Sequence, residues 1–515
     1  MNVVFVVSDT FRRDNLACYG PSQVKTPNLD KLADKSYVFD NAYLGSFPTL
    51  PNRLDIMSGR FSCVDHQWCA LPKDTITLQQ ILSASGVVTQ MISDNAHLVE
   101  DGYNYERGFD GWEWIRGQES DHWKVTPRDI ELPAHPDKLN RANFTVKNYL
   151  RNTSWWKSEE DRFVARTVTE ACNWLENEGQ DLEKFFLYVD IFDPHEPWDA
   201  PEEYLKMYES DYSGDNVFYP YSDVWQEFLS EDELKHIQAL YKASVTMVDH
   251  WVGVLRAKIE KLGLEEDTVF IFTSDHGFLF GEHGFLGKTY NPHPDKGHYE
   301  AFRMLSEIRR IPLLIHMPGQ KTGQHLEALV QSPDLMPTIL ELSGLVVTES
   351  FSGKSNIQAL QCGVFYTNDW KFNPEAIHGK SLMPLIRGEA QSVREIAVCS
   401  NTLIHHTPVV AKCSIITEDG WCLHYAGYYP EELKDSVILN RRLIAPKAKK
   451  IPIEPALFYL PDDPNEEHDL IQSNKELAEE IHRRYVQWLE EIGTPEEHLA
   501  GRRKFMIRRG DRELS

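Results

Sequence analysis

Short apolar runs alternate with amphipathic stretches along most of the chain. The runs are rich in β-branched and aromatic residues, and they are Val3–Val7, Val87–Ile92, Phe185–Ile191, Val269–Thr273 and Pro312–His316. Strands of this kind with helical patterns between them are typical of a largely parallel sheet. The pattern therefore predicts an α/β fold in which helices cover both faces of one sheet.

Two of the helices between these runs have clear ends. Thr77–Ser85 is followed by Gly86, which suits the left-handed residue that closes many helices. Ser230 and Glu233 form a capping box, and apolar residues at helical spacing then continue up to Gly263. We expect both helices to belong to the scaffold.

The pattern changes after about residue 390. Shorter strand-like pieces and a last helix pattern follow, namely Ile396–Ser400, Cys413–Thr417, Cys422–Tyr425 and Lys475–Ile492. We predict a catalytic domain over residues 1–390 and a smaller α+β domain over residues 391–515, built from an antiparallel sheet and a packed helix.

The composition excludes several classes of protein. With 515 residues, 41% of them hydrophobic, the chain can bury a large core, and no apolar run approaches the roughly 20 residues of a membrane helix. The formal net charge of −26 opposes binding to nucleic acid or to anionic lipid. Met1–Asp9 has a strand pattern without a basic leader, and no two cysteines form a Cys-x-x-Cys pair, so we expect a cytoplasmic protein with reduced thiols.

Acidic and aromatic residues concentrate in one segment, Glu202–Glu233. We interpret it as a surface excursion, and the alternative is that it lines the mouth of a pocket.

Residues with acid, base or metal chemistry follow three of the predicted strands. The strands end at Asp9, at Asp193-Pro-His195 and at Asp275-His276. The carboxyl ends of parallel strands meet at one edge of a sheet, where ligands bind. Burying several carboxylates together costs roughly several kcal/mol unless a cation or hydrogen bonds offset the cost. A divalent metal ion is the simplest interpretation.

A further candidate group precedes a predicted helix. In Gly45–Gly59, Pro51 is followed by apolar residues at helical spacing, which places Thr49 near a helix N-terminus. Backbone N–H groups favour an anion at that place, and Arg53 can stabilise charge on a nucleophile. An ordinary cap, a first-turn proline and a surface arginine are the alternative, and the residues alone leave both open.

Taken together, these segments resemble the sulfatase family of the alkaline phosphatase superfamily over nearly the whole chain. Thr49–Arg53 is similar to the Cys/Ser-x-Pro-x-Arg signature, and Asp193–Pro197 looks like the Asp-Pro-His-x-Pro element. Asn2–Asp9 resembles the first metal segment, and Ser274–Gly277 with the later Lys288 resembles the second. The resemblance implies an alkaline-phosphatase-like fold and a hydrolase that acts on ester bonds.

Several positions depart from the family pattern. Thr49 stands where sulfatases carry the Cys or Ser that becomes formylglycine, so no formylglycine is expected and Thr49 itself would be the nucleophile. Thr10 replaces a frequent second Asp, Asn95-Ala-His97 replaces Lys-x-His, and His276 replaces a frequent Asn. These departures make the chain more similar to the phosphonate monoester and phosphodiester hydrolases.

The resemblance also implies roles for individual residues. One divalent ion is expected to be bound by Asp9, Thr49, Asp275 and His276. Oxygen ligands with one imidazole suit Ca²⁺, Mg²⁺ or Mn²⁺, with Zn²⁺ as an alternative. The expected catalytic residues are Thr49, Arg53, His195 and Lys288. The expected substrate-binding residues are Asn95, His97, His195 and Lys288. A second metal is a disfavoured alternative, for which Asp193, His195, His283, His293 and His298 are available.

We therefore expect a metal-dependent hydrolase of small anionic sulfate or phosphate-type esters, including monoesters, diesters and phosphonates, with a cationic pocket in an acidic chain. A phosphotransferase using the same threonine and a catalytically silent scaffold are the alternatives. The sequence contains no apparent membrane anchor, which counts against the phosphotransferase. The silent scaffold is disfavoured because the chain retains the residues of the costly cluster, namely Asp9, Arg53, Asp275, His276 and Lys288. The basic tail from Arg502 to Arg512 is expected to be solvated, with docking onto a second subunit of a homo-oligomer as the alternative.

Overall fold

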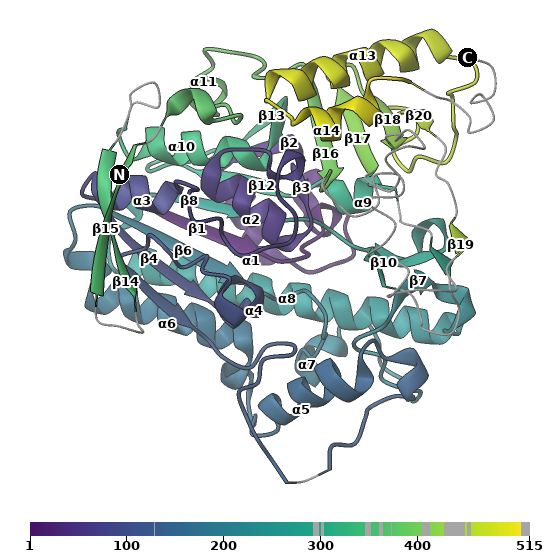
Figure 1. Cartoon of the computed structure of the whole chain (residues 1–515). Helices are drawn as coiled ribbons and strands as arrows, with labels where there is room; N and C mark the ends of the chain where they lie inside the picture. Colours follow the sequence, from purple (N-terminus) through teal and green to yellow (C-terminus); the bar gives the residue numbers. More distant parts are fainter. Residues whose placement is uncertain are drawn as a thin grey trace.

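An eight-stranded sheet lies at the centre of the larger part of the molecule (Figure 1). The computed structural model describes residues 1–127, 129–291, 298–299, 303–345, 352–359, 364–371, 373–403, 412–426, 449–450 and 455–505. The strand order is β13 (Gln324–Gln331), β2 (Tyr37–Tyr43), β12 (Leu313–His316), β8 (Thr268–Thr273), β1 (Asn2–Ser8), β6 (Phe185–Ile191), β4 (Val88–Ser93) and β5 (Gly111–Trp114). The strands from β8 to β5 are mutually parallel, whereas β12 is antiparallel to both of its neighbours. The predicted α/β fold with a largely parallel sheet is confirmed, and β2, β5 and β13 are additional to the predicted strands.

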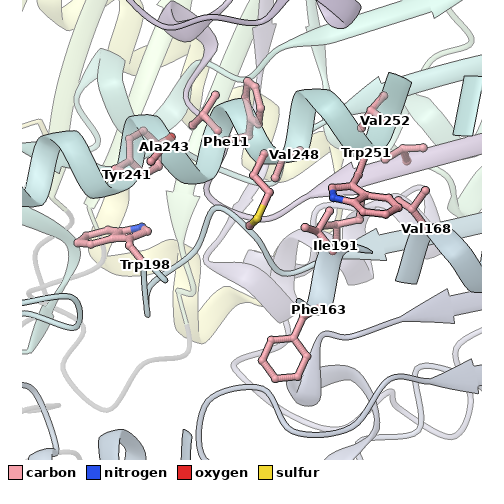
Figure 2. Close-up of a cluster of buried hydrophobic side chains, with 14 of the residues drawn as sticks. Phe11, Phe163, Val168, Ile191, Trp198, Tyr241, Ala243, Val248, Trp251 and Val252 are labelled. Atoms are coloured by element: carbon pink, nitrogen blue, oxygen red, sulfur yellow. The ribbon is translucent and has the colours of Figure 1, made fainter. Parts of the chain in front are cut away.

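Helices cover both faces of this sheet, as predicted. Val4 and Val6 of β1 belong to a core shared with α1 (Pro27–Ala33), α6 (Phe163–Asn177) and α8 (Glu231–Lys261). Figure 2 shows part of this core, in which Tyr241 and Trp251 of α8 lie near Trp198 and Val168.

The opposite face has its own core. Val3, Phe5 and Val7 pack there with α2 (Thr49–Ser58), α3 (Leu78–Ala84) and α10 (Leu335–Leu342). Side chains of β1 thus alternate between the two cores, as expected of a strand buried on both faces.

The helix α8 begins with the predicted capping box. The Ser230 hydroxyl accepts a hydrogen bond from the backbone N–H of Glu233 at 3.3 Å, and the Glu233 carboxylate accepts one from the Ser230 N–H at 2.8 Å. We expect Ser230→Ala to lower the free energy of unfolding by about 1 kcal/mol, because one N–H at the helix start loses its partner. Urea denaturation measures the change. Ser210→Ala, in an exposed loop, is the control and should stay within about 0.5 kcal/mol; equal losses in the two variants would contradict the prediction.

A second, five-stranded sheet follows the first in the chain. Its order is β20 (Ala456–Tyr459), β18 (Trp421–Ala426), β17 (Lys412–Thr417), β16 (Ile396–Asn401) and β3 (Ser46–Phe47). The four later strands are antiparallel and pack against α13 (Lys475–Glu491), as predicted for the smaller α+β unit. The short β3, from just before Thr49, joins β16 in parallel. The boundary near residue 390 stays a prediction.

Shorter elements complete the described part of the chain. They are α4 (Ala96–Val99), α5 (Lys147–Thr153), α7 (Glu202–Leu205), α9 (Ser306–Arg309), α11 (Met383–Ile386), α14 (Glu496–Leu499), β7 (Ser222–Val224), β9 (Leu279–Phe280), β10 (Phe285–Asn291), β11 (His298–Tyr299), β14 (Ser352–Ala359), β15 (Val364–Lys371) and β19 (Lys449–Lys450). Within the described ranges, no helix is long and apolar enough to cross a membrane. The seven cysteines in the same ranges form no disulfide with one another. The expected reduced state of the thiols stays a prediction.

Candidate active site

The ends of β1 and β8 bring Asp9, Asp275 and His276 together, as the sequence predicts. All three side chains are fully buried, and one ligand atom from each lies within 4.8 Å of the other two. Burial and the adjacent Asp275 raise the pKa of Asp9 well above its ordinary value, although Arg53 opposes them. Burial also acts on Asp275, but the Arg53 guanidinium and His276 lower the pKa of that carboxyl overall. The site thus offers a carboxylate oxygen from each of Asp9 and Asp275 and a ring nitrogen from His276. Such a set of ligands suits a hard divalent cation.

The imidazole of His276 is available as a neutral ligand. Burial lowers the pKa of His276 to about 3, so the ring carries no charge at neutral pH. Its Nδ1 atom lies 3.1 Å from the carbonyl oxygen of Gly277, which leaves Nε2 facing the site. Gly277 is required beside it, because a Cβ atom there would lie 1.9 Å from the carbonyl oxygen of Glu307.

Thr49 is the first residue of α2, as Pro51 led us to expect. Its side chain is buried, and its Oγ1 atom lies 3.5 Å from His276 Nε2. The loop before it is fixed by Asp55, whose carboxylate accepts hydrogen bonds from the N–H groups of Ser46 at 2.6 Å and Ser62 at 2.7 Å. The hydroxyl of Thr49 is thus held beside the three candidate metal ligands.

The Arg53 guanidinium lies among three buried carboxylates. It pairs with Asp275, lies 3.2 Å from Asp9, and donates two hydrogen bonds to Asp190 at 3.0 and 3.1 Å. Burial alone would lower the pKa of Arg53, but Asp190, Asp275 and Asp9 raise it well above its ordinary value. The structure therefore places Arg53 as the compensating charge of the carboxylate cluster.

Asp190 is a site residue that sequence reasoning missed. It lies within the apolar run of β6, which the hydrophobic pattern assigns to the core. A signal was present, because a lone carboxylate in a fully buried strand must find hydrogen-bonding or charged partners. Tyr188, two residues earlier and on the same face of the strand, donates one of those hydrogen bonds at 2.6 Å.

Lys288 and His195 lie on another side of the cluster. Lys288 Nζ donates to the Thr10 hydroxyl at 2.9 Å and lies 3.6 Å from a carboxylate oxygen of Glu196. Thr10 in turn donates to Asp9 at 2.8 Å, which connects Lys288 to the candidate metal ligands. Burial lowers the pKa of His195 well below its ordinary value, with Lys288 adding to the effect, so this ring is neutral.

Asn95 and His97 follow β4, and they face different partners. Asn95 Nδ2 lies 3.2 Å from Asp190 Oδ1 and 3.5 Å from Asp9 Oδ2. His97 Nε2 lies 3.2 Å from a carboxylate oxygen of Glu119, whose other oxygen accepts a hydrogen bond from the Tyr219 hydroxyl at 2.8 Å. Asn95 thus belongs to the carboxylate cluster, and His97 is held at its edge.

Glu119 and Tyr219 come from loops without hydrophobic periodicity, so no sequence pattern pointed to them. Tyr219 lies in the segment Glu202–Glu233 and is only 4% exposed. This residue of the segment is therefore packed inside the protein and connects through Glu119 to His97, so the segment is not wholly a surface excursion. That it lines the mouth of a pocket stays a prediction.

The expected cationic pocket is not what the described side chains form. Asp9, Asp190, Asp275, Glu119 and Glu196 are all at least nine-tenths buried, and the cationic residues among them are Arg53 and Lys288. Arg53 and Lys288 lie beside carboxylates, so the side chains alone supply no surplus of positive charge. The expected cationic pocket included a bound metal ion and stays a prediction. A bound cation has to supply any surplus of positive charge.

Of the residues considered for a second metal, Asp193, His195 and His283 belong to no group of three or more potential metal ligands among the described residues. The Asp193 carboxyl is engaged with the backbone of Val164 at the start of α6, and His283 lies 3.9 Å from Glu307. His293 and the side chain of His298 lie outside the described residues.

A second group of potential metal ligands lies elsewhere, at the junction of α9 with the smaller sheet. It consists of Cys422, His424 and Glu466, all buried. Arg309 donates to Glu466 at 2.8 Å, and His424 lies 2.7 Å from the other oxygen of that carboxylate. Arg309 already balances the charge of Glu466, so we assign this group to the packing of the two sheets.

Comparisons with known proteins agree with this geometry. A family model described as Sulfatase matches residues 1–345. The N-acetylglucosamine-6-O-sulfatase of Bacteroides thetaiotaomicron is 24% identical over 424 residues, which span 72% of this chain and 72% of that protein. PehA of Trinickia caryophylli, a multifunctional alkaline phosphatase superfamily protein, is 25% identical over 434 residues, spanning 72% and 78%. The crystal structure of the phosphonate monoester hydrolase of Agrobacterium radiobacter matches with a TM-score of 0.66 at 17% identity, over 95% of this chain and 96% of that one. The chain belongs to the sulfatase family.

Proposed function

We propose that the chain is a metal-dependent hydrolase of sulfate or phosphate-type esters with Thr49 as the nucleophile. The observation that carries the proposal is the position of the Thr49 hydroxyl, at the first residue of α2 and 3.5 Å from Nε2 of His276, which is grouped with Asp9 and Asp275 as a candidate metal ligand. Named relatives include sulfatases and a multifunctional member of the alkaline phosphatase superfamily. The family membership supports ester hydrolysis as the reaction class.

The residues present fit one divalent ion, which Asp9, Asp275, His276 and Thr49 would hold. Their oxygen-rich donor set favours Ca²⁺, Mg²⁺ or Mn²⁺ over softer ions, with Zn²⁺ as an alternative. When bound, such an ion supplies Lewis acidity, which lowers the pKa of a nearby hydroxyl and polarises an ester oxygen.

We assign a separate role in the reaction to each side chain around Thr49. The Thr49 oxygen, which loses its proton to solvent before the attack, forms a bond to sulfur or phosphorus while the bond to the leaving oxygen breaks. Water then cleaves the threonine adduct: its oxygen bonds to sulfur or phosphorus, the Thr49 oxygen leaves, and a water proton returns to the group that protonated the leaving oxygen. We assign protonation of the leaving oxygen to Lys288, because the buried ring of His195 is neutral. Asn95, His97 and His195 bind the remaining substrate oxygens, and Arg53 keeps the carboxylate cluster compensated.

The charge of the site favours monoanionic substrates. Counted as ionised, the five buried carboxylates of the site exceed its two cationic side chains by three charges, and one divalent ion would reduce that excess to one. The carboxylates are Asp9, Asp190, Asp275, Glu119 and Glu196, and the cationic side chains are Arg53 and Lys288. Sulfate monoesters, phosphodiesters and phosphonate monoesters carry a single negative charge, whereas a phosphate monoester carries nearly two at neutral pH. We therefore place phosphate monoesters last among the candidate substrates.

A panel of chromogenic esters tests the proposal. The full chain, supplied with Mn²⁺, Mg²⁺ or Ca²⁺, is assayed with an aryl sulfate, an aryl phosphate, a bis-aryl phosphate and an aryl phosphonate. We expect at least one monoanionic ester to exceed the aryl phosphate in kcat/KM by about tenfold, which corresponds to ~1.4 kcal/mol, and we expect chelator to abolish its turnover. No turnover of any ester with any metal would favour the scaffold alternative, and faster transfer to an added alcohol than to water would favour the phosphotransferase.

A further inference from the structure

The carboxylate of Asp190 connects the residues of the candidate centre without being one of its metal ligands. It accepts hydrogen bonds from Arg53 Nε at 3.1 Å and Nη2 at 3.0 Å, from Asn95 at 3.2 Å and from the Tyr188 hydroxyl at 2.6 Å. Asp190 is fully buried, so water does not compete for these bonds. All the hydrogen-bonding capacity of one carboxylate is used to hold neighbouring side chains.

The geometry of the pair with Arg53 fixes where the guanidinium points. Asp190 occupies the edge formed by Nε and Nη2, so Nη1 faces Asp275 and the remaining side of Nη2 faces Asp9 at 3.2 Å. A bidentate pair of this kind holds both orientation and distance. The amide of Asn95 also bridges two carboxylates, because its Nδ2 atom lies near both Asp190 and Asp9. Asp190 thus sets the positions of the groups that touch both candidate metal-binding carboxylates.

The charge of the cluster depends on Asp190 as well. Asp9, Asp190 and Asp275 are each fully buried and face one guanidinium, which leaves two negative charges for a divalent cation to neutralise. Without Asp190, Arg53 would pair only with Asp9 and Asp275 and would compete with a cation for their oxygens. Buried charges of this kind interact strongly, because little solvent screens them.

We propose that Asp190 is a positioning residue of the metal centre, which raises its affinity for a divalent cation by holding Arg53 side-on and Asn95 in place. The inference rests on the proposed metal-dependent function, but it concerns cation binding, so the two are tested separately.

Manganese binding to the metal-depleted full chain is the measurement, by titration calorimetry or by the loss of the free Mn²⁺ electron paramagnetic resonance signal. We expect Asp190→Asn to weaken Mn²⁺ binding at least tenfold and to shrink the rise in melting temperature that Mn²⁺ produces. Tyr188→Phe is the matched control, because it removes one hydrogen bond to the same carboxylate and keeps the pair with Arg53. Its Mn²⁺ affinity should stay within about threefold of wild type. A merely structural role would lower the melting temperature equally with and without Mn²⁺.

Asp190→Glu provides the second variant, which keeps the charge and displaces the carboxylate by one methylene. It should also lose affinity for Mn²⁺, and it carries the test if Asp190→Asn does not fold. Wild-type Mn²⁺ affinity in either folded variant overturns the inference, as does a wild-type chain that binds no Mn²⁺. If the Asp190 variants bind Mn²⁺ more weakly but the wild-type chain cleaves no ester, the inference is supported and the proposed function is rejected. If the wild-type chain cleaves an ester but the Asp190 variants bind Mn²⁺ as wild type does, the proposed function is supported and the inference is rejected.

Discussion

Replacement of Thr49 by alanine is expected to reduce kcat by about 10³- to 10⁶-fold, with a much smaller change in KM. The variant removes the oxygen that forms the covalent adduct, and loss of a nucleophile costs orders of magnitude in other enzymes of this mechanistic type. The fold should survive, because the contact of the side chain with His276 is long at 3.5 Å. Steady-state kinetics on the best ester of the panel measures the effect, with urea denaturation confirming a loss of no more than about 1 kcal/mol.

Thr49→Ser is the matched control for that variant. It keeps the hydroxyl at the start of α2 and removes only a methyl group, so kcat should remain within about tenfold of wild type. Mass spectrometry of the peptide that contains Thr49, after rapid quenching, should detect a sulfo or phospho adduct in wild type and none in Thr49→Ala. Full activity of Thr49→Ala would show that the nucleophile is another group.

The part of this site that the sequence predicts is the part that follows from strand topology. Asp9 and Asp275-His276 come directly after apolar runs, and parallel strands bring such residues to one edge. Thr49 could be placed because Pro51 marks a helix start. Each of these signals lies within a few residues of the sequence, and the parallel order of the strands is enough to predict that the strand ends meet at one edge of the sheet.

The residues that escaped prediction depend on pairings that no local pattern records. Asp190 lies inside an apolar strand, and its role appears only when Arg53 of α2 is seen beside it. Glu119 and Tyr219 lie in irregular segments about 100 residues apart. The same limit applies to the charge of the pocket, since a sequence shows which charged residues are present but not which of them pair with one another. The sequence also did not predict that β12 runs antiparallel to its neighbour β8, because an apolar run has the same pattern in either chain direction.

Loss of the Arg53 guanidinium is expected to cause the largest change in stability. Arg53→Ala leaves Asp9, Asp190 and Asp275 facing one another with no cation, and all three are fully buried. Removing one partner of a buried ion pair typically costs 3–5 kcal/mol, so we expect a loss of at least about 3 kcal/mol in the presence of chelator. Urea denaturation at neutral pH measures it.

A divalent cation should restore part of that loss, because it compensates the same carboxylates that Arg53 compensates. Added Mn²⁺ is therefore expected to stabilise Arg53→Ala more than it stabilises wild type, while turnover stays low because the ligands are no longer held in position. Arg60→Ala is the control: Arg60 pairs with Asp65 at 3.2 Å near the surface, with the two side chains 39% and 27% exposed, and such pairs contribute about 0–1 kcal/mol. Equal losses in the two variants would mean that the buried cluster is compensated by something other than Arg53. A larger loss in Arg53→Ala that Mn²⁺ partly reverses would establish that the guanidinium and the cation share one set of carboxylates.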